Sequence, residues 1–327
     1  MTIFRRLAAL SASALCAAAL AQAPAAPSAG PYPSRPITIV VPFGPGGSND
    51  MFARAIALEL NNAWKQPVVV ENRPGGGGSI GAAQVARASP DGYTLMLASS
   101  TFTINAVLQP KLPFDPVKSF TPIALVAKGP MMFVASPGLA ARSVPELIAL
   151  ARSRPGKVTY ASAGSGSINQ MGSEMLASAT GIKLLHVPYK GGAQAVNDLL
   201  ASHVDLYLGS MPQVMPQVRA GKLNPIAVTS PQRTKVAPEV PAVGEAVPNY
   251  ALELWWGVFG PANVPREIVA LVNAEIRKAL DTPKLRQFME SEAATPGTDS
   301  PEQFGTFVAR ELQHWHKVAK EADIRLD

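Results

Sequence analysis

The chain is poor in cysteine and histidine. Cys16 is its one cysteine, and its 327 residues include four histidines. A single cysteine forms no disulfide within the chain, and Leu15 is not the small residue that precedes a lipid-modified cysteine. His314 and His316 lie two positions apart on an expected helix and point to different faces, unlike a zinc-binding pair. We therefore expect a mature protein with no disulfide framework, no thiol chemistry, no metal and no cofactor.

Charged and aromatic residues are also sparse. Charged residues make up 16% of the chain and aromatic residues 6%, and the formal net charge is +6. The basic residues are scattered, without a basic arm or an array of aromatic side chains for stacking bases. These features exclude a nucleic-acid-binding protein. After the N-terminal stretch, no apolar run is long enough to span a membrane.

The N-terminus has the pattern of a secretory signal peptide. The Arg5-Arg6 pair precedes the apolar stretch Leu7–Leu20, and the small-x-small patterns Ala19–Ala21 and Ala21–Ala23 follow. The alternative is a membrane anchor, but the apolar stretch is shorter than the roughly 20 residues that a spanning helix needs. We expect residues 1–23 to form the signal peptide and the mature protein to be exported.

Strand-like and helix-like segments alternate along the rest of the chain, which is typical of an α/β fold with parallel sheets flanked by helices. The first group is Ile37–Val41, Met51–Trp64, Val68–Val70, Ile80–Arg87 and Thr94–Ala98. The pattern restarts with Val144–Arg152, Val158–Ser162, Asn169–Ala179, Leu184–Val187, Gly192–Leu200, Val204–Leu208 and Ile226–Thr229. Two helices, Pro265–Leu280 and Pro301–Glu321, close the chain.

Two α/β groups predict two lobes, since the chain is also long for a single domain. We place lobe 1 at residues 31–130 plus 228–327 and lobe 2 at residues 131–227. The chain crosses between them near Met131–Ser136 and Ile226–Ser230. The two C-terminal helices are expected to pack back on the first lobe.

Two glycine-rich loops stand between a strand and a helix, one in each group. The loop Pro42–Asp50 follows the first strand, and Ser162–Gln170 occupies the equivalent place in the second group. Unpaired backbone N–H groups at a helix start, with glycines that admit a ligand, make a site for a carboxylate or phosphate. The alternative is an ordinary helix capped by Ser48 or Asn49.

Other polar residues follow neighbouring strands. Ser99–Thr101 ends another strand and so offers hydroxyls at the same level as the loops. Ligands of open α/β sheets bind at this level, beyond the carboxyl ends of the strands. Lys190 is either an anion contact or a solvated lysine. Asp205 accepts a hydrogen bond either from an amine or hydroxyl of the ligand or from a local backbone N–H.

Two catalytic or cofactor patterns fail. The stretch Gly76–Gly81 has the GxGxxG spacing of a dinucleotide site, but Glu71–Pro74 separates it from its strand. Ser165 has the right place for the nucleophile of a hydrolase, but Ala163 and Ser167 break the GxSxG pattern.

An ordered set of short motifs is similar to the Bug family, the periplasmic binding proteins of tripartite tricarboxylate transporters. The set spans essentially the whole mature chain and consists of Tyr32–Ile37, Pro42–Asp50, Val69–Gly75, Ser89–Thr94, His186–Gly191, Gly221–Leu223 and Ile226–Ser230. Each motif is weak alone, whereas their order is specific.

The resemblance implies a two-lobed flytrap fold that holds a ligand carboxylate between its lobes with backbone amides, hydroxyls and ordered waters. The matching positions are Phe43, Gly47, Ser48, Asp50 and Thr101 in lobe 1 and Ser162, Ser165 and Ser167 in lobe 2. Gln170 replaces a histidine of many relatives, and Gly209-Ser210 replaces an acidic or amide pair. These departures favour an aromatic or less polar carboxylate, and Gln170 and Asp205 complete the candidate ligand-binding residues.

We therefore expect a periplasmic, monomeric solute-binding protein, not an enzyme. It captures a small carboxylate, which is a di- or tricarboxylate, an amino acid or an aromatic carboxylate, for integral-membrane transporter subunits. One alternative is an accessory that presents its ligand to a membrane sensor. The other is a secreted hydrolase, for which the sequence nominates no activated nucleophile.

Overall fold

The computed structural model describes residues 32–109, 111–291 and 293–321. The expected signal peptide, residues 1–23, and Cys16 lie outside the described residues. All the elements below belong to one unit that begins at Arg35. Among the described residues, none of the helices combines the length and the apolar character of a membrane-spanning segment.

The first part of the sheet forms around β1 (Ile37–Val41), where the sequence predicted a strand. β1 pairs in parallel with β2 (Val68–Asn72) on one side and β3 (Thr94–Ser99) on the other. All the apolar residues of β1 are fully buried, as expected for a strand covered on both faces. β9 (Glu253–Pro261) pairs antiparallel with β3 and so brings a late segment of the chain into this part of the sheet.

One long strand, β4 (Phe120–Ala135), connects the two parts of the sheet. It pairs with β9 as far as Pro130 and, from Met131 onward, with β7 (Leu206–Ser210) and β8 (Asn224–Val228), in each case antiparallel. The strand order is β2-β1-β3-β9-β4-β7-β5-β6, with β8 and β10 also paired to β4. The remaining strands are β5 (Thr159–Ser162), β6 (Leu185–Pro188) and β10 (Thr295–Pro296).

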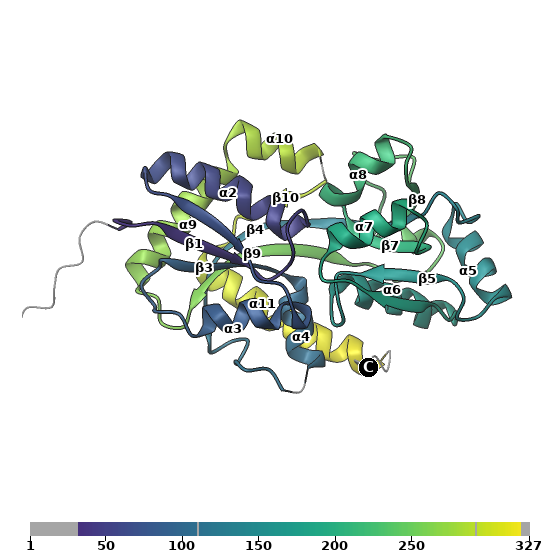
Figure 1. Cartoon of the computed structure of the whole chain (residues 1–327), viewed down its shortest axis with the longest axis horizontal. Helices are drawn as coiled ribbons and strands as arrows, with labels where there is room; N and C mark the ends of the chain where they lie inside the picture. The colour runs from purple at the N-terminus through teal and green to yellow at the C-terminus, as the bar shows by residue number, and fades with distance from the viewer. Residues whose placement is uncertain (1–31, 110, 292, 322–327) are drawn as a thin grey trace, which may run out of the picture. The chain divides into compact units, whose positions relative to one another are not determined.

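Helices flank both parts of the sheet (Figure 1). Around β1, β3 and β9 lie α2 (Ser48–Trp64), α3 (Ser79–Ala86), α4 (Ser100–Leu108), α9 (Arg266–Leu280), α10 (Pro283–Ser291) and α11 (Pro301–Glu321). Around β5 and β7 lie α5 (Val144–Ser153), α6 (Ile168–Thr180), α7 (Gly192–Leu200) and α8 (Met211–Arg219). Short 3-10 turns are η1 (Gly76–Gly78) and η2 (Val243–Glu245).

The C-terminal helices pack on the first part of the sheet, as the sequence predicted. α11 contacts α4 and β4, and α9 contacts β4 and α2. Phe304 of α11 joins a buried cluster with Phe102 and Phe259, and its ring centroid lies 5.0 Å from that of Phe259. Such an aromatic pair stabilises the fold by about 1 kcal/mol beyond the free energy gained from the apolar area that it buries.

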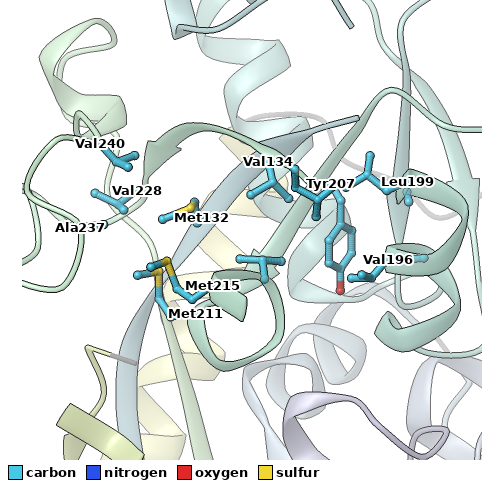
Figure 2. Packing of buried hydrophobic residues seen from close by; sticks show 14 of the residues in the cluster. Met132, Val134, Val196, Leu199, Tyr207, Met211, Met215, Val228, Ala237 and Val240 are labelled. Carbon is cyan, nitrogen blue, oxygen red and sulfur yellow. The ribbon is translucent and has the colours of Figure 1, made fainter. Parts of the chain in front are cut away.

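A second buried cluster holds α7 and α8 against β4 and β7. Figure 2 shows Met132 and Val134 of β4, Tyr207 of β7, and Met211 and Met215 of α8 in this cluster. Met211 and Met215 are four residues apart, so they lie on the same face of α8. Because both are buried, they fix the position of the start of α8 relative to β4.

The segment after β8 also packs in the second cluster, which includes Val228, Ala237, Val240 and Ala242. Val228 forms a parallel bridge with Ala242. The boundaries that we placed at residues 130/131 and 227/228 stay a prediction. These contacts associate residues 228–242 with β4 and β8, whereas the sequence argument had assigned them to lobe 1.

Thr229 connects the segments that run between the two parts of the sheet. Its hydroxyl accepts a hydrogen bond from Met131 N (2.8 Å) and donates one to Leu252 O (2.7 Å). Its own backbone N donates to Met131 O, and Leu252 N donates to Thr229 O. Thr229 is fully buried, so these bonds are shielded from water.

Candidate functional site

A cavity lies beyond the carboxyl ends of β1, β3, β5 and β7, between the two parts of the sheet. Apolar side chains that line it are Phe43, Met131, Ala163, Ile168 and Leu254. Its other lining residues stand at the starts of five helices: Gly47–Asn49 of α2, Ser99 and Thr101 of α4, Asn169 of α6, Gly192 of α7, and Ser210 and Gln213 of α8. Tyr207 of β7 completes the lining.

Five helix starts, which carry partial positive charge, surround the cavity, and its described lining has no cationic side chain. Each helix start carries unpaired N–H groups and the positive end of the helix dipole. Four of the five helices, α2, α4, α7 and α8, begin without a hydrogen bond from a capping side chain. Among the described residues that line the cavity, none is charged. The arrangement is suited to an anion that accepts hydrogen bonds from backbone amides and hydroxyls.

The start of α2 is uncapped because Gly47, and neither Ser48 nor Asn49, occupies the N-cap position. The alternative of a serine or asparagine cap is therefore wrong. Asp50, in the first turn of α2, instead accepts hydrogen bonds from Gly46 N (2.9 Å) and Asn72 Nδ2 (2.9 Å). Asn72 also donates to Phe43 O at 3.1 Å, so the two side chains hold the whole loop in place.

Asp50 stays ionised although it is only 4% exposed. Burial alone would raise the pKa of its carboxyl. Hydrogen bonds from Arg54, Gly46 N and Asn72, with the charge of Arg54, outweigh burial and hold the pKa below its ordinary value. Arg54 Nε lies 3.0 Å from Asp50 Oδ2. Asp50 is therefore a positioning residue for the α2 loop, and it does not line the cavity.

One hydrogen bond crosses the cavity from α4 to α6. Ile168 N, at the start of α6, donates to Thr101 Oγ1 at 3.2 Å. Ser167 caps α6 by accepting from Gln170 N (3.4 Å), and Gln170 Oε1 accepts from Gly166 N (2.8 Å). Thr101 thus joins the first part of the sheet to the second at the site itself.

A chain of hydrogen bonds that begins at Asn169, next to Ile168, also lines the cavity. Asn169 Nδ2 donates to Leu208 O (2.6 Å) and to Tyr207 Oη (3.3 Å). Tyr207 Oη donates to Gln213 Oε1 at 2.9 Å. Burial raises the pKa of Tyr207, so this hydroxyl keeps its proton. Two buried polar atoms of the lining residues, Ser210 Oγ and Gln213 Nε2, have no hydrogen-bond partner among the described residues.

Four of the residues that the resemblance implied, Phe43, Gly47, Ser48 and Thr101, come together in the lining of this cavity. Ser165 lies outside it and lines a neighbouring opening together with Phe43, Gly164 and Lys190. Ligand binding by these residues stays a prediction, since the structure shows their places and not their ligand.

Ser162, Ser167, Gln170 and Asp205 do not line the cavity and instead form hydrogen bonds within the second part of the structure. Ser162 Oγ lies 2.6 Å from His186 Nε2 and also accepts from Gly164 N (3.1 Å). Ser162 is fully buried, so it has no open approach for a substrate. Asp205 accepts from Thr159 N at 2.8 Å. This is a backbone contact, as in one of the two alternatives, but its donor lies on the neighbouring strand β5 and is not local in sequence. Ser167 and Gln170 form the bonds to the start of α6 given above.

Ser99, in the predicted Ser99–Thr101 segment, lines the cavity, and so do Asn49 and Asn169 of the two predicted loops. The sequence argument did not name Tyr207, Ser210 and Gln213 as ligand-binding residues. Ser210 stands directly at a strand end, where ligands of α/β folds bind, so its position was a usable signal. Gln213 had none, because α8 contains Pro212 and Pro216 and was not predicted as a helix.

The sequence and the structure are similar to those of known proteins. The model of the tripartite tricarboxylate transporter family receptor, TctC, matches residues 52–324. BugT of Bordetella pertussis is 36% identical over 302 residues, which cover 91% of this chain and 93% of BugT. A Rhodopseudomonas palustris protein solved with adipate is 34% identical, with a TM-score of 0.87 over 90% of this chain and 99% of that chain. MatC of the same organism, solved with bound malate, is 31% identical, with a TM-score of 0.85 over 88% and 99% of the respective chains.

The fold and the cavity define a two-lobed periplasmic solute-binding protein. The chain belongs to the TctC family of tripartite tricarboxylate transporter receptors, which confirms the family that the ordered motifs indicated.

Proposed function

We propose that the protein captures a small carboxylate in the cavity between its lobes and delivers it, chemically unchanged, to the integral-membrane subunits of a tripartite tricarboxylate-type transporter. It acts in the periplasm after removal of its signal peptide. One lobe binds the carboxylate first, and closure of the other lobe completes the site.

The observation that supports this proposal is the convergence of five helix starts on a cavity whose described lining has no charged side chain. Unpaired N–H groups satisfy a carboxylate directly, and the helix dipoles offset the loss of its hydration. A cationic or zwitterionic ligand would bring an ammonium group that finds no carboxylate in the described lining. The adipate and malate in the related structures belong to the same chemical class.

Thr101 stands on α4 and its hydroxyl bonds the start of α6, so it contacts both sides of the site and is the residue to test. With Thr101→Val the shape of the side chain is retained, but the hydroxyl that bonds Ile168 N is lost. The Thr101 hydroxyl accepts from Ile168 N, so its own proton is left to donate to the ligand carboxylate. We expect affinity for the best carboxylate to fall about ten-fold, the usual consequence of removing one hydrogen bond to a charged group. Isothermal titration calorimetry of the mature protein measures the change, after a thermal-shift screen of mono-, di- and tricarboxylates, aromatic carboxylates and amino acids has found the ligand.

Thr121→Val is the matched control. Thr121 is a half-buried threonine of β4 whose hydroxyl bonds Pro261 O, and it lies outside the cavity. This variant should bind like the unaltered protein. The proposal fails if no carboxylate raises the melting temperature, or if both variants bind with the same affinity as the unaltered protein.

A further inference from the structure

We propose that Trp256 of β9 is a positioning residue of the site, which orients the Ser48 hydroxyl so that it donates a hydrogen bond to the ligand carboxylate. Ser48 lines the cavity, whereas Trp256 does not. Trp256 therefore acts through Ser48 and does not touch the ligand. This inference rests on the proposed function and deepens it, because carboxylate capture alone does not say which group fixes the direction of the hydroxyl.

The hydrogen bond between the two side chains has one possible direction. Trp256 Nε1 lies 3.3 Å from Ser48 Oγ, and an indole N–H donates but does not accept. Ser48 Oγ is therefore the acceptor, and its single proton is left for another group. Within the described chain, this is the one hydrogen bond of the Ser48 side chain. Because Ser48 borders the cavity, a bound carboxylate supplies the acceptor for this proton.

The ring of Trp256 contacts the same helix at a second point. It packs on Phe52, with the ring centroids 4.4 Å apart, and both side chains are fully buried. Ser48 and Phe52 are four residues apart, so they lie on one face of α2. One indole thus contacts this face twice, through its N–H at the first helical residue and through its ring one turn later. These contacts hold the start of α2, which no side chain caps, against the sheet.

The backbone of Trp256 lies within the sheet and has strands on both sides. β9 lies between β3 and β4, and Trp256 pairs with Ser99 of β3 and Ala127 of β4. Successive residues of a strand face opposite sides of a sheet. Trp255 accordingly faces α11, where its Nε1 donates to Glu311 Oε2 at 2.9 Å. Of the two adjacent indoles, that of Trp256 is the one that donates to a residue of the cavity lining.

A double-mutant cycle between Trp256 and Ser48 tests the inference. The probe for calorimetry is the carboxylate that raises the melting temperature of the mature protein most, from a set that includes adipate, malate, benzoate and glutamate. Trp256→Phe keeps an aromatic ring beside Phe52 but removes the donor, so we expect affinity to fall about five-fold. In the Ser48→Ala background the same substitution should change affinity less than about two-fold, because the hydroxyl on which it acts is absent.

Trp255→Phe is the matched control. It removes a similarly buried indole from the adjacent position of β9 and breaks the bond to Glu311, which keeps a bond from Trp315 Nε1 at 3.2 Å. We expect this variant to be less stable than the unaltered protein in urea unfolding and to bind the probe with unchanged affinity. Equal losses of affinity in the two tryptophan variants would indicate a general loosening of the sheet and would overturn the inference.

A spectroscopic measurement follows the same hydrogen bond without altering Trp256. The chain has four tryptophans, so the indole N–H signal of Trp256 in nuclear magnetic resonance spectra is assigned by replacing Trp64, Trp255 and Trp315 one at a time. Ser48→Ala should shift this signal in the ligand-free protein, because the indole loses its acceptor. Titration of the unaltered protein with the probe should also shift it, with the dissociation constant that calorimetry gives.

Two further results would overturn the inference. One is an affinity loss for Trp256→Phe that is the same with and without the Ser48 hydroxyl, and the other is a Trp256 signal that Ser48→Ala leaves in place. In either case carboxylate capture still stands. If Trp256→Phe does not fold, the signal alone decides. A screen in which no carboxylate raises the melting temperature would instead overturn both proposals.

Discussion

At the scale of single residues, glycines set how closely the two lobes approach each other. A Cβ on Gly77, in η1, would lie 2.6 Å from Ser165 O in the loop before α6. Gly191, before α7, faces Gly44 in the loop after β1, where a Cβ would lie 3.3 Å from Gly44 N. These contacts join loops on opposite sides of the cavity. The glycine-rich stretch that resembles a dinucleotide motif thus lies against the other lobe.

Gly77→Ala should therefore impair closure and spare the fold. The added methyl group would meet Ser165 O, a backbone oxygen that cannot move as freely as the end of a side chain. It would also lie 2.9 Å from the side-chain amide of Asn105, which can shift. Under the proposed function, the closed form becomes less populated, and apparent ligand affinity falls in proportion. We expect a loss of about ten-fold or more in calorimetry, with a larger radius of gyration of the liganded protein in X-ray scattering.

Gly181→Ala separates closure from backbone strain. Gly181 has φ +65°, close to the +63° of Gly77, but nothing lies within 4 Å of an added Cβ. Both variants carry the same left-handed strain of about 1 kcal/mol, and only Gly77→Ala adds the contact across the cavity. Equal affinities in the two variants would show that Gly77 has no part in closure.

At the scale of elements, the sequence predicted most of the regular structure and failed where packing overrides local preference. β1 and α7 have the predicted bounds, and α5 begins at the predicted Val144, directly after its cap Ser143. α4 was missed because its sequence, STFTINAVL, is rich in residues with low helix propensity, and burial of its residues and contact with α11 stabilise it. Most of β4 was missed because Pro122, Gly129 and Pro130 interrupt its pattern.

The candidate site could be predicted from the sequence only in part. The two loops that begin α2 and α6 follow recognisable strands, so their anion-binding character could be inferred from spacing and glycine content. Gln213 could not, because its place in the cavity depends on α8 packing against β4 through Met211 and Met215. Which of the loop's polar residues face inward was equally unpredictable, since Asp50 turns back to Gly46 and Asn72.

Thr229, which joins the segments that cross between the lobes, is expected to contribute to the stability of the fold. Thr229→Val keeps the shape of the side chain but leaves Met131 N without its partner in a fully buried position. We expect the free energy of unfolding to fall by about 1–3 kcal/mol, the cost of a buried donor left unpaired. Urea unfolding measures it, and Thr229→Ser, which retains the hydroxyl, should recover most of the loss. Equal stability of the two variants would count against a role for this hydroxyl.

At the scale of the whole molecule, two buried clusters of the described residues lie in the two parts of the structure that line the cavity. One core, with Phe102, Phe259 and Phe304, holds the loops of α2 and α4, and the other, with Tyr207 and Met211, holds the starts of α7 and α8. Each core keeps its own half of the site rigid. Under the proposed function, we expect movement in the crossing segments, such as those joined by Thr229, and ligand affinity would then report the balance between open and closed forms.

A site of this kind should bind its ligand independently of pH near neutrality. Tyr207 is the one ionisable side chain of the described lining, and burial raises its pKa away from the neutral range. Asp50 supports the α2 loop and keeps its charge, since Arg54, Gly46 N and Asn72 outweigh the effect of burial on its pKa. We expect the dissociation constant of a fully ionised carboxylate, measured by calorimetry, to stay constant within about two-fold from about pH 6 to about pH 9. A change in affinity with a midpoint near 6.5 would contradict this and would implicate a histidine, with His186, beside Ser162, the first to replace by glutamine.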